Sequence, residues 1–161
     1  MSRIGFGFDT HQLKPSTEII LGGIAIASDV ASIGHSDADV LIHAICDALL
    51  GALALRDIGF HFPDNSDEFQ DIDSKILLSK TAEMIRAKGW EIGNIDSTVC
   101  LEKPKLKDHI PLMQNTLASV MGILPDQISV KATTTETLGF VGAGEGVAAY
   151  AVALIYQPET Q

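Results

Sequence analysis

HSDADVLIHAICDALLGALAL, residues 35–55, is the stretch of this sequence that decides the predicted fold. Positions 40–42, 44–46 and 48–50 are apolar, so a helix here carries hydrophobic side chains nearly all round its axis. Such a helix is buried in a core, and this one, interrupted by Asp47, is too short to cross a membrane. Ser36, followed by Asp39 three residues later, predicts a capping box at its start.

The segments on either side of this helix are expected to hold strands and two further helices. Alternating or continuous apolar residues predict strands over 3–11, 18–26, 95–102, 127–135 and 146–156, with a bulge or bend at Gly22–Gly23. Helices are expected over about 73–88 and 109–121, and the Asp-rich stretch 56–72 is expected to be a loop. No repeat or linker divides the 161 residues, so we expect a single domain over 1–161.

The order of these elements predicts an α+β fold with two layers. Strands alternate with helices, and strand pairs open and close the chain, which favours a mixed β-sheet covered on one face by helices. The other face of such a sheet needs a cover, and oligomerisation would supply one.

The composition excludes several classes of protein. A net charge of −10 argues against general binding of nucleic acid or of an anionic membrane. Cys46 and Cys100 lie in apolar contexts without CxxC spacing and are expected to be reduced core thiols. The N-terminus has no apolar segment of the kind that directs export, so we expect a soluble, cytoplasmic protein.

A metal site is predicted from FGFDTHQL, residues 6–13. Asp9 and His11 are two residues apart in a strand, so their side chains point the same way and can converge on one ion. His43 in the apolar helix is the third candidate ligand, and Asp39 one turn earlier is expected to orient its ring. This ligand set suits catalytic zinc and also non-haem iron.

Two further segments favour binding of phosphate. His35 and Ser36 lie at a predicted helix N-terminus, which attracts anions, although simple capping also accounts for them. VKATTTETLGF, residues 130–140, carries three consecutive threonines before Glu136, which suits a cradle for phosphate and a magnesium ion as well as a helix cap. The sequence has no nucleophile motif, and phosphoryl transfer needs little beyond positioning and charge neutralisation.

Four stretches of the chain together resemble one enzyme family. GFGFDTHQL, GHSDADVLIHAICDALLGALALRDIGFHFPD, KPKLKDHIPLM and VKATTTETLGFVGAGEG are similar in order and spacing to the 2-C-methyl-D-erythritol 2,4-cyclodiphosphate synthases. The resemblance implies a lyase that converts 4-diphosphocytidyl-2-C-methyl-D-erythritol 2-phosphate to the 2,4-cyclodiphosphate and CMP in non-mevalonate isoprenoid biosynthesis. It also implies a homotrimer, with three sheets packed around a threefold axis and active sites between subunits.

The resemblance also implies roles for individual residues. Asp9, His11 and His43 would hold zinc, Glu136 would hold magnesium or manganese, and His35 and Thr134 would stabilise the transition state. The remaining implied contacts are to the substrate: Thr10, Ser36, Asp57, Ile58, Gly59, Phe62, Pro63, Asp64, Asn65, Ser66, Leu101, Glu102, Lys103, Pro104, Lys105, Leu106, Lys107, Thr133, Thr135 and Phe140. Residues 57–59 and 62–66 would contact the methylerythritol part, and 101–107 with Thr133 would form the cytidine pocket.

One position departs from the family pattern, and two other functions stay open on the residues alone. Ala143 stands where the family commonly has arginine, at the central cavity of the trimer. An iron oxygenase with a two-histidine, one-carboxylate site is the first alternative. A metal-stabilised nucleotide-binding or scaffold protein without turnover is the second.

Overall fold

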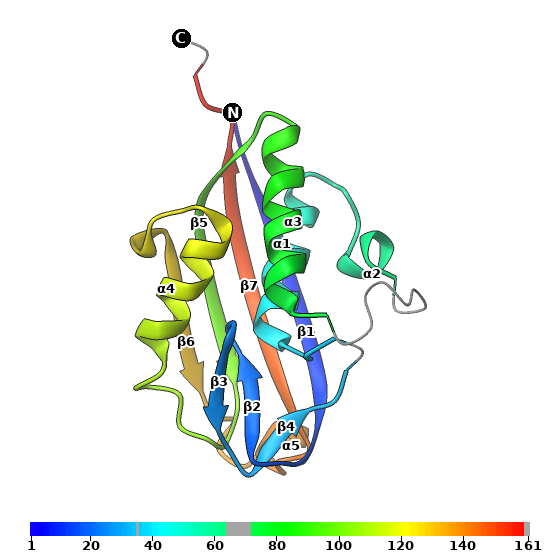
Figure 1. The fold of residues 1–161 in the computed structure, drawn as a ribbon, viewed down its shortest axis with the longest axis vertical. Helices are drawn as coiled ribbons and strands as arrows, with labels where there is room; N and C mark the ends of the chain where they lie inside the picture. Colours follow the sequence, from blue (N-terminus) through cyan, green and yellow to red (C-terminus); the bar gives the residue numbers. More distant parts are fainter. Residues whose placement is uncertain (35, 64–71, 160–161) are drawn as a thin grey trace.

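The computed structural model describes residues 1–34, 36–63 and 72–159, and in this part of the chain the strands form a five-stranded sheet and a separate two-stranded one (Figure 1). The strands are β1 (Ser2–Pro15), β2 (Glu18–Leu21), β3 (Ile24–Ala27), β4 (Val30–Ser32), β5 (Glu91–Cys100), β6 (Ile128–Thr133) and β7 (Gly146–Tyr156). The helices are α1 (Val40–Ala52), α2 (Ile58–His61), α3 (Ser74–Ala87), α4 (Ile110–Met121) and α5 (Gly139–Gly142), with a 3-10 turn over Pro125–Gln127.

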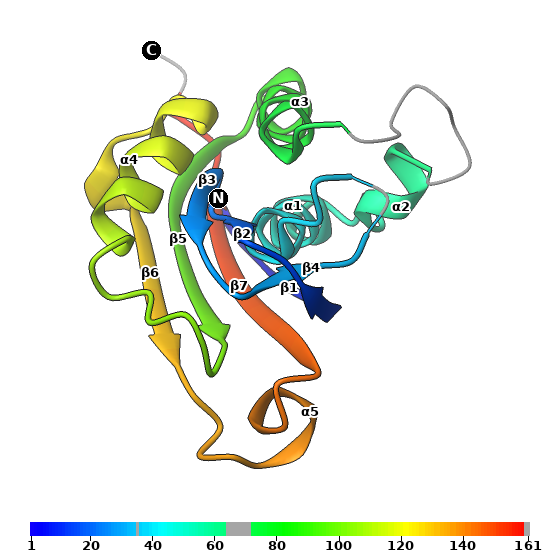
Figure 2. The same cartoon turned by 60° about the horizontal axis from the view of Figure 1, so that its bottom comes forward.

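The main sheet is mixed, as predicted. Its strand order is β4-β1-β7-β5-β6, with β5 and β6 parallel and the other neighbours antiparallel. Helices α1, α3 and α4 and the β2–β3 hairpin lie in front of the sheet in Figure 1, and Figure 2 shows that the sheet is curled. The predicted two-layer α+β fold, with helices on one face of the sheet, is therefore confirmed.

Helix α1 lies directly on β1 because β1 has glycine at two inward-facing positions. A Cβ at Gly5 would overlap the carbonyl oxygen of Ala48, and a Cβ at Gly7 would overlap that of Ala44. The absence of side chains at these positions lets the helix backbone approach the strand closely. Ten of the thirteen residues of α1 are buried, in agreement with its nearly all-round apolar sequence.

Replacing Gly7 by alanine is expected to destabilise the fold strongly. The added Cβ would meet backbone atoms, with the amide nitrogen of Ala48 at 2.6 Å, so the helix must move away from the sheet. Overpacking of this kind costs about 1–3 kcal/mol of unfolding free energy, and a backbone clash places the change at the upper end. Urea unfolding measures the cost.

Gly51→Ala provides the control, because Gly51 lies near the end of α1, the helix that the Gly7 substitution would displace. A Cβ there would be 3.7 Å from the Phe6 carbonyl oxygen, which is ordinary van der Waals contact. Gly51→Ala should therefore leave stability unchanged or raise it by up to about 1 kcal/mol. Equal stability of the Gly7→Ala variant and the wild type would show that the contact between α1 and β1 is looser than described.

The face of the sheet opposite the helices carries exposed apolar side chains. On β1 these are Ile4, Phe6 and Phe8, which are 70%, 62% and 44% exposed. On β7, Tyr150 and Val152 lie opposite Phe8 and Phe6 in the register, and the Phe8 and Tyr150 rings are 5.1 Å apart. A contiguous apolar patch of this kind is typical of a surface that another protein chain covers.

Two local predictions were wrong, and Asp39 is involved in both. Residues 18–26 do not form one strand: Gly22 and Gly23, both at positive φ, form the turn of the β2–β3 hairpin. Asp39, rather than Ser36, is the N-cap of α1, and its side chain accepts a hydrogen bond from the Ile42 amide. The same fully buried carboxylate accepts from the amides of Gly22 and Gly23, so it links the hairpin turn to the helix.

The other predicted elements differ mainly in length. Strands β1 and β5 extend beyond the predicted ranges, and the short helix α2 lies within residues that were expected to be a loop. Neither cysteine forms a disulfide; Cys46 is buried in the core, as expected, whereas Cys100 is only partly buried. None of the helices in the described part of the chain has the length and hydropathy that a bilayer crossing requires.

Candidate functional site

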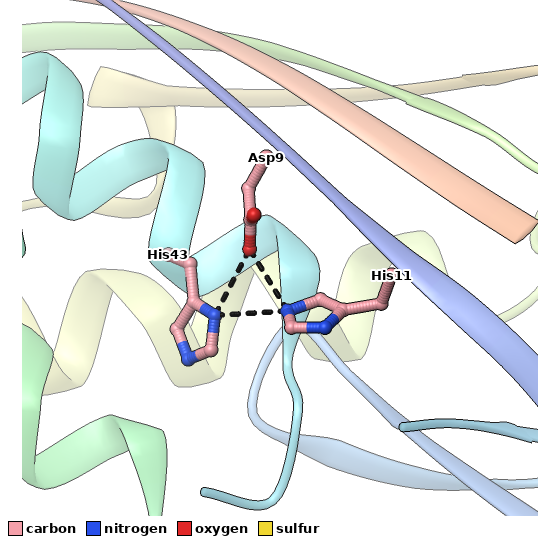
Figure 3. A group of neighbouring side chains, drawn as sticks. All are labelled: Asp9, His11 and His43. Carbon is pink, nitrogen blue, oxygen red and sulfur yellow. Dashed lines mark hydrogen bonds and ion pairs between the residues drawn. The ribbon is translucent and has the colours of Figure 1, made fainter. Parts of the chain in front are cut away.

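Asp9, His11 and His43 point toward one another (Figure 3). Asp9 and His11 occupy alternate positions of β1, on the same side of the strand as Gly5 and Gly7 and therefore toward the helices. His43 comes from the first turn of α1, one helical turn after its N-cap. The close packing of α1 on β1 thus brings the third side chain to the first two.

The geometry of the three side chains fits a tetrahedral metal ion. Asp9 Oδ2 lies 2.9 Å from His11 Nε2 and 3.0 Å from His43 Nδ1, and the two nitrogens are 3.2 Å apart. Ligand atoms bound to zinc at the usual distances, in a tetrahedron, are separated by about 3.3 Å. Three protein ligands would leave the fourth position of the ion open, as in catalytic zinc sites.

A hydrogen bond at Nδ1 of His11 fixes which of its ring nitrogens faces the candidate metal site. His11 Nδ1 is 2.8 Å from the carbonyl oxygen of Ile33. A carbonyl only accepts, so Nδ1 carries the proton and the lone pair of a neutral ring is on Nε2, the atom that faces Asp9. A hydrogen bond of this type fixes the ring of a metal-binding histidine.

The electrostatics of the metal-free site reflect the same contacts. Burial alone would raise the pKa of Asp9, but hydrogen bonds and charge interactions with His11 and His43 lower it well below its usual range. Burial opposes the positive charge of His11, yet the Asp9 carboxylate raises the pKa of this histidine above its ordinary value. Asp9 is therefore anionic at neutral pH, as a metal ligand must be.

The residues behind His43 differ from those expected from the sequence. The side chain of Asp39 binds the hairpin turn and does not orient the ring. Instead, His43 Nε2 lies 3.1 Å from both the Ser36 and the Ser74 hydroxyl oxygens. Ser74 in turn contacts Asp37. Sequence reasoning missed Ser74 because it lies thirty-one positions after His43 and no local pattern connects them.

A cavity of about 370 Å³ opens at the three side chains. It is also lined by the predicted contact residues Ser36, Ile58, Gly59 and Phe62, whereas the side chain of Asp57 caps α2 by accepting from the Phe60 amide. Asp47, a lining residue that sequence reasoning missed, accepts from the Ile58 amide, and burial raises its pKa. Its position one helical turn after His43 is the signal that could have revealed it.

The predicted cytidine-binding segment surrounds a second cavity of about 300 Å³. Its lining consists of Leu101, Pro104, Lys105, Leu106, Lys107, Ile110, Ala132, Thr133 and Thr134. Glu102 accepts from the amide of Thr135, and so ties this segment to the threonines. The structure therefore brings the basic loop 103–107 and the end of β6 together.

The segment that was predicted to bind phosphate, residues 130–140, continues from the end of β6 into an exposed turn. Glu136 has a positive φ of 53°, and its Oε1 accepts a hydrogen bond from the Thr134 hydroxyl at 3.1 Å. Figure 2 shows that the segment between β6 and α5 projects away from α1 and α2. Phe140, in α5, lines a third cavity of about 670 Å³ with Thr10 and His11.

Asp9, His11 and His43 form a candidate metal-ligand cluster, and residues 134–136 after β6 form an exposed threonine turn. Within one chain, the metal-ligand cluster and the threonine turn are separated across the sheet. Thr10, between the two ligands of β1, is in register with Ala148 of β7, which pairs with Cys100 of β5, which pairs with Thr133. Three strand spacings correspond to about 14 Å. Among the described lining residues, none is shared by the first two cavities.

Several predicted site residues lie elsewhere. Pro63 is exposed and Lys103 lines a large open cavity with Glu102 and Ala143. His35, Asp64, Asn65 and Ser66 lie outside the described residues.

The chain is similar over almost its whole length to known proteins. Residues 2–156 match the model of the YgbB family. A Bacteroides fragilis (strain YCH46) protein named 2-C-methyl-D-erythritol 2,4-cyclodiphosphate synthase is 64% identical over 153 residues, which cover 95% of this chain and 96% of that protein.

Two solved structures extend the likeness to the fold. One is described as IspF of Plasmodium falciparum in complex with CDP; it is 34% identical with a TM-score of 0.86, covering 98% of this chain and 97% of that one. The other is the bifunctional IspDF of Campylobacter jejuni, which is 38% identical with a TM-score of 0.94 over 99% of this chain; the match spans only 43% of that longer chain. This chain belongs to the YgbB family.

Proposed function

We propose that this protein is a 2-C-methyl-D-erythritol 2,4-cyclodiphosphate synthase and that residues 1–161 form a single catalytic domain. The enzyme converts 4-diphosphocytidyl-2-C-methyl-D-erythritol 2-phosphate to the 2,4-cyclodiphosphate and CMP, a step of isoprenoid precursor biosynthesis in the cytoplasm. The observation that carries the proposal is the convergence of Asp9, His11 and His43 at a cavity, in a chain that is 64% identical to a protein of that name.

The reaction is an intramolecular phosphoryl transfer. An oxygen of the substrate's 2-phosphate forms a bond to the β-phosphorus, and the bond from that phosphorus to the bridging oxygen breaks, so the electron pair leaves with CMP. The chain need only align the two phosphates and offset their charge. Zinc, bound by the cluster, would neutralise a substrate phosphate oxygen at its open position.

The other residues supply positioning. Residues 101–107 and Thr133 surround a cavity that suits the cytidine, and the neighbouring Thr134 hydroxyl and Glu136 carboxylate suit a β-phosphate and a magnesium or manganese ion. Ile58 and Gly59 line the metal cavity, where the hydroxyls of the methylerythritol part would need acceptors, and Asp57 precedes them as the cap of α2. A role for His35 in the transition state stays a prediction from the sequence.

The active site is proposed to lie between subunits of a homotrimer. Two observations support this arrangement: the exposed apolar face of β1 and β7, and the separation of the metal-ligand cluster from the threonine turn within one chain. A neighbouring subunit would complete each site and also cover the apolar face.

³¹P NMR of the purified protein with the diphosphocytidyl substrate, zinc and magnesium tests the proposed reaction. Appearance of CMP together with a cyclic diphosphate is the expected result. Substrate that stays intact, in a protein that has bound zinc, would overturn the proposal and favour a binding protein without turnover.

Mixing two inactive variants tests whether sites are shared between subunits. His43→Ala removes the metal half of a site and Glu136→Gln the magnesium half, so each alone is expected to be inactive. Refolded together at equal amounts, random trimers have one intact half of each kind at about one quarter of their interfaces, and about one quarter of wild-type activity should return. If each site lay within one chain, the mixture would stay inactive.

A further inference from the structure

The ring of His43 is held from behind by Ser74, which is buried, and by its partly buried partner Asp37. We propose that this pair is a positioning device that keeps the proton of His43 on Nε2 and leaves the lone pair of Nδ1 for the metal. The inference rests on the metal-binding part of the proposed function. It assigns a role to two residues that do not themselves contact the metal.

Asp37 holds Ser74 with both of its carboxylate oxygens. The Ser74 hydroxyl donates to Asp37 Oδ1 in a short hydrogen bond, and the Ser74 amide donates to Oδ2 at 3.1 Å. Asp37 is itself anchored, because its amide donates to the carbonyl oxygen of Ile72. The side chain of Ser74, at the first residue of α3, is fully buried. The pair therefore joins the segment before α1 to the start of α3.

The direction of these hydrogen bonds determines the tautomer of His43. A carboxylate only accepts, so the single hydroxyl proton of Ser74 points toward Asp37. The Ser74 oxygen then faces His43 Nε2, 3.1 Å away, with a lone pair, and it can only accept there. The ring must donate there, so Nε2 carries a proton. Nδ1 faces the Asp9 carboxylate at 3.0 Å, and in the neutral ring that a metal ion would bind, Nδ1 is the nitrogen without a proton.

Ser36 fits the same direction. Its hydroxyl oxygen accepts from the Ala38 amide and lies 3.1 Å from His43 Nε2 and 3.4 Å from the Ser74 oxygen. Its proton can go to the Ser74 oxygen, so Ser36 too can accept from His43. Without Asp37, the Ser74 hydroxyl would be free to donate to Nε2. The proton of the neutral His43 ring would then be on Nδ1, the atom that faces Asp9.

Each of the two histidines is thus held by a hydrogen bond from the ring nitrogen that faces away from the cluster, and this nitrogen differs between them. His11 donates from Nδ1 to a backbone carbonyl and offers Nε2, whereas His43 donates from Nε2 to a hydroxyl backed by a carboxylate and offers Nδ1. The proton of each ring is directed away from the point where the three ligand atoms meet. In the neutral rings that a metal ion would bind, both lone pairs face that point, and hydrogen bonds that hold the rings in this way raise the affinity of such a site.

Ser74→Ala and Asp37→Asn are expected to weaken zinc binding about 10- to 100-fold, the usual effect of losing a hydrogen bond that orients a metal-binding histidine. The double variant should lose no more than the stronger single variant, because both changes break one chain of hydrogen bonds. Asp73→Asn is the matched control: Asp73 caps the same helix by accepting from the Lys75 amide, and asparagine caps equally well. Its zinc affinity should stay within about twofold of the wild type.

The measurements are zinc affinity by competition with a chromophoric chelator, and the ¹⁵N shifts of His43 in the zinc-loaded protein. Zinc at Nδ1 and a proton on Nε2 in the wild type, with loss of zinc affinity in both variants, is the expected result. Zinc at Nε2 of His43 in the wild type would overturn the inference even if the variants fail to fold. Unchanged zinc affinity in Ser74→Ala would do the same. A wild type that binds no zinc would instead refute the metal site in the proposed function.

Discussion

His43→Ala is expected to remove the metal and nearly all turnover. The substitution leaves Asp9 and His11 as the only ligands of the three, and two ligands bind zinc poorly. Without the metal, the negative charge of the reacting phosphate is no longer offset, and kcat/KM should fall by about 10³-fold or more. Zinc content after dialysis, measured by mass spectrometry, and CMP release together report the two effects.

His109→Ala is the control for this substitution. His109 precedes α4, and its side chain makes no capping hydrogen bond. The variant should keep the zinc content and the turnover of the wild type. Zinc that survives in His43→Ala would show that the ligand assignment is wrong. Oxygen-sensitive iron in the purified wild type would favour the oxygenase with a two-histidine, one-carboxylate site.

The convergence of Asp9, His11 and His43 could be predicted because the placement of two of them depends only on strand geometry. Alternation along β1 dictates that Asp9 and His11 share a side, whatever the rest of the chain does. His43 required one more step, since a polar ring in an apolar helix needs a partner. The sequence could not indicate how closely α1 approaches β1, which the glycines at positions 5 and 7 decide.

The wrong predictions concern side chains whose partners are distant in the sequence. Asp39 lies one turn before His43, so local spacing made it the natural partner of the ring. In the structure its carboxylate caps three amides, two of them at Gly22 and Gly23 in the hairpin turn. Ser74, the actual neighbour of the ring, comes from another helix, and only the packing of α3 beside α1 brings it there.

The uncovered face of the sheet was predictable from the order of elements. A chain with few helices can cover one face of a mixed sheet, and Ile4, Phe6 and Phe8 alternate with the glycines that face α1. What the order of elements does not indicate is the separation of the metal-ligand cluster from the threonine turn. That separation follows from strand order, because β7 and β5 lie between β1 and β6.

Glu136→Gln is expected to have the opposite metal signature from His43→Ala. Glu136 lies on the exposed turn after β6 and is not one of the three candidate zinc ligands, so zinc content should be unchanged. Glutamine keeps the side-chain length and can still accept from the Thr134 hydroxyl. The variant therefore removes the negative charge and little else, and a divalent ion bridging the diphosphate would lose its protein ligand.

Magnesium-dependent CMP release should fall about 10²- to 10³-fold in Glu136→Gln, the usual effect of losing one group that stabilises charge in the transition state. Glu83→Gln is the matched control, because Glu83 also accepts from a hydroxyl, that of Ser79, but lies on α3 away from both cavities. Its turnover should equal that of the wild type. Retained turnover in Glu136→Gln across a magnesium titration would remove Glu136 from the mechanism. Loss of zinc together with turnover would contradict the expectation that the two metal ions bind independently.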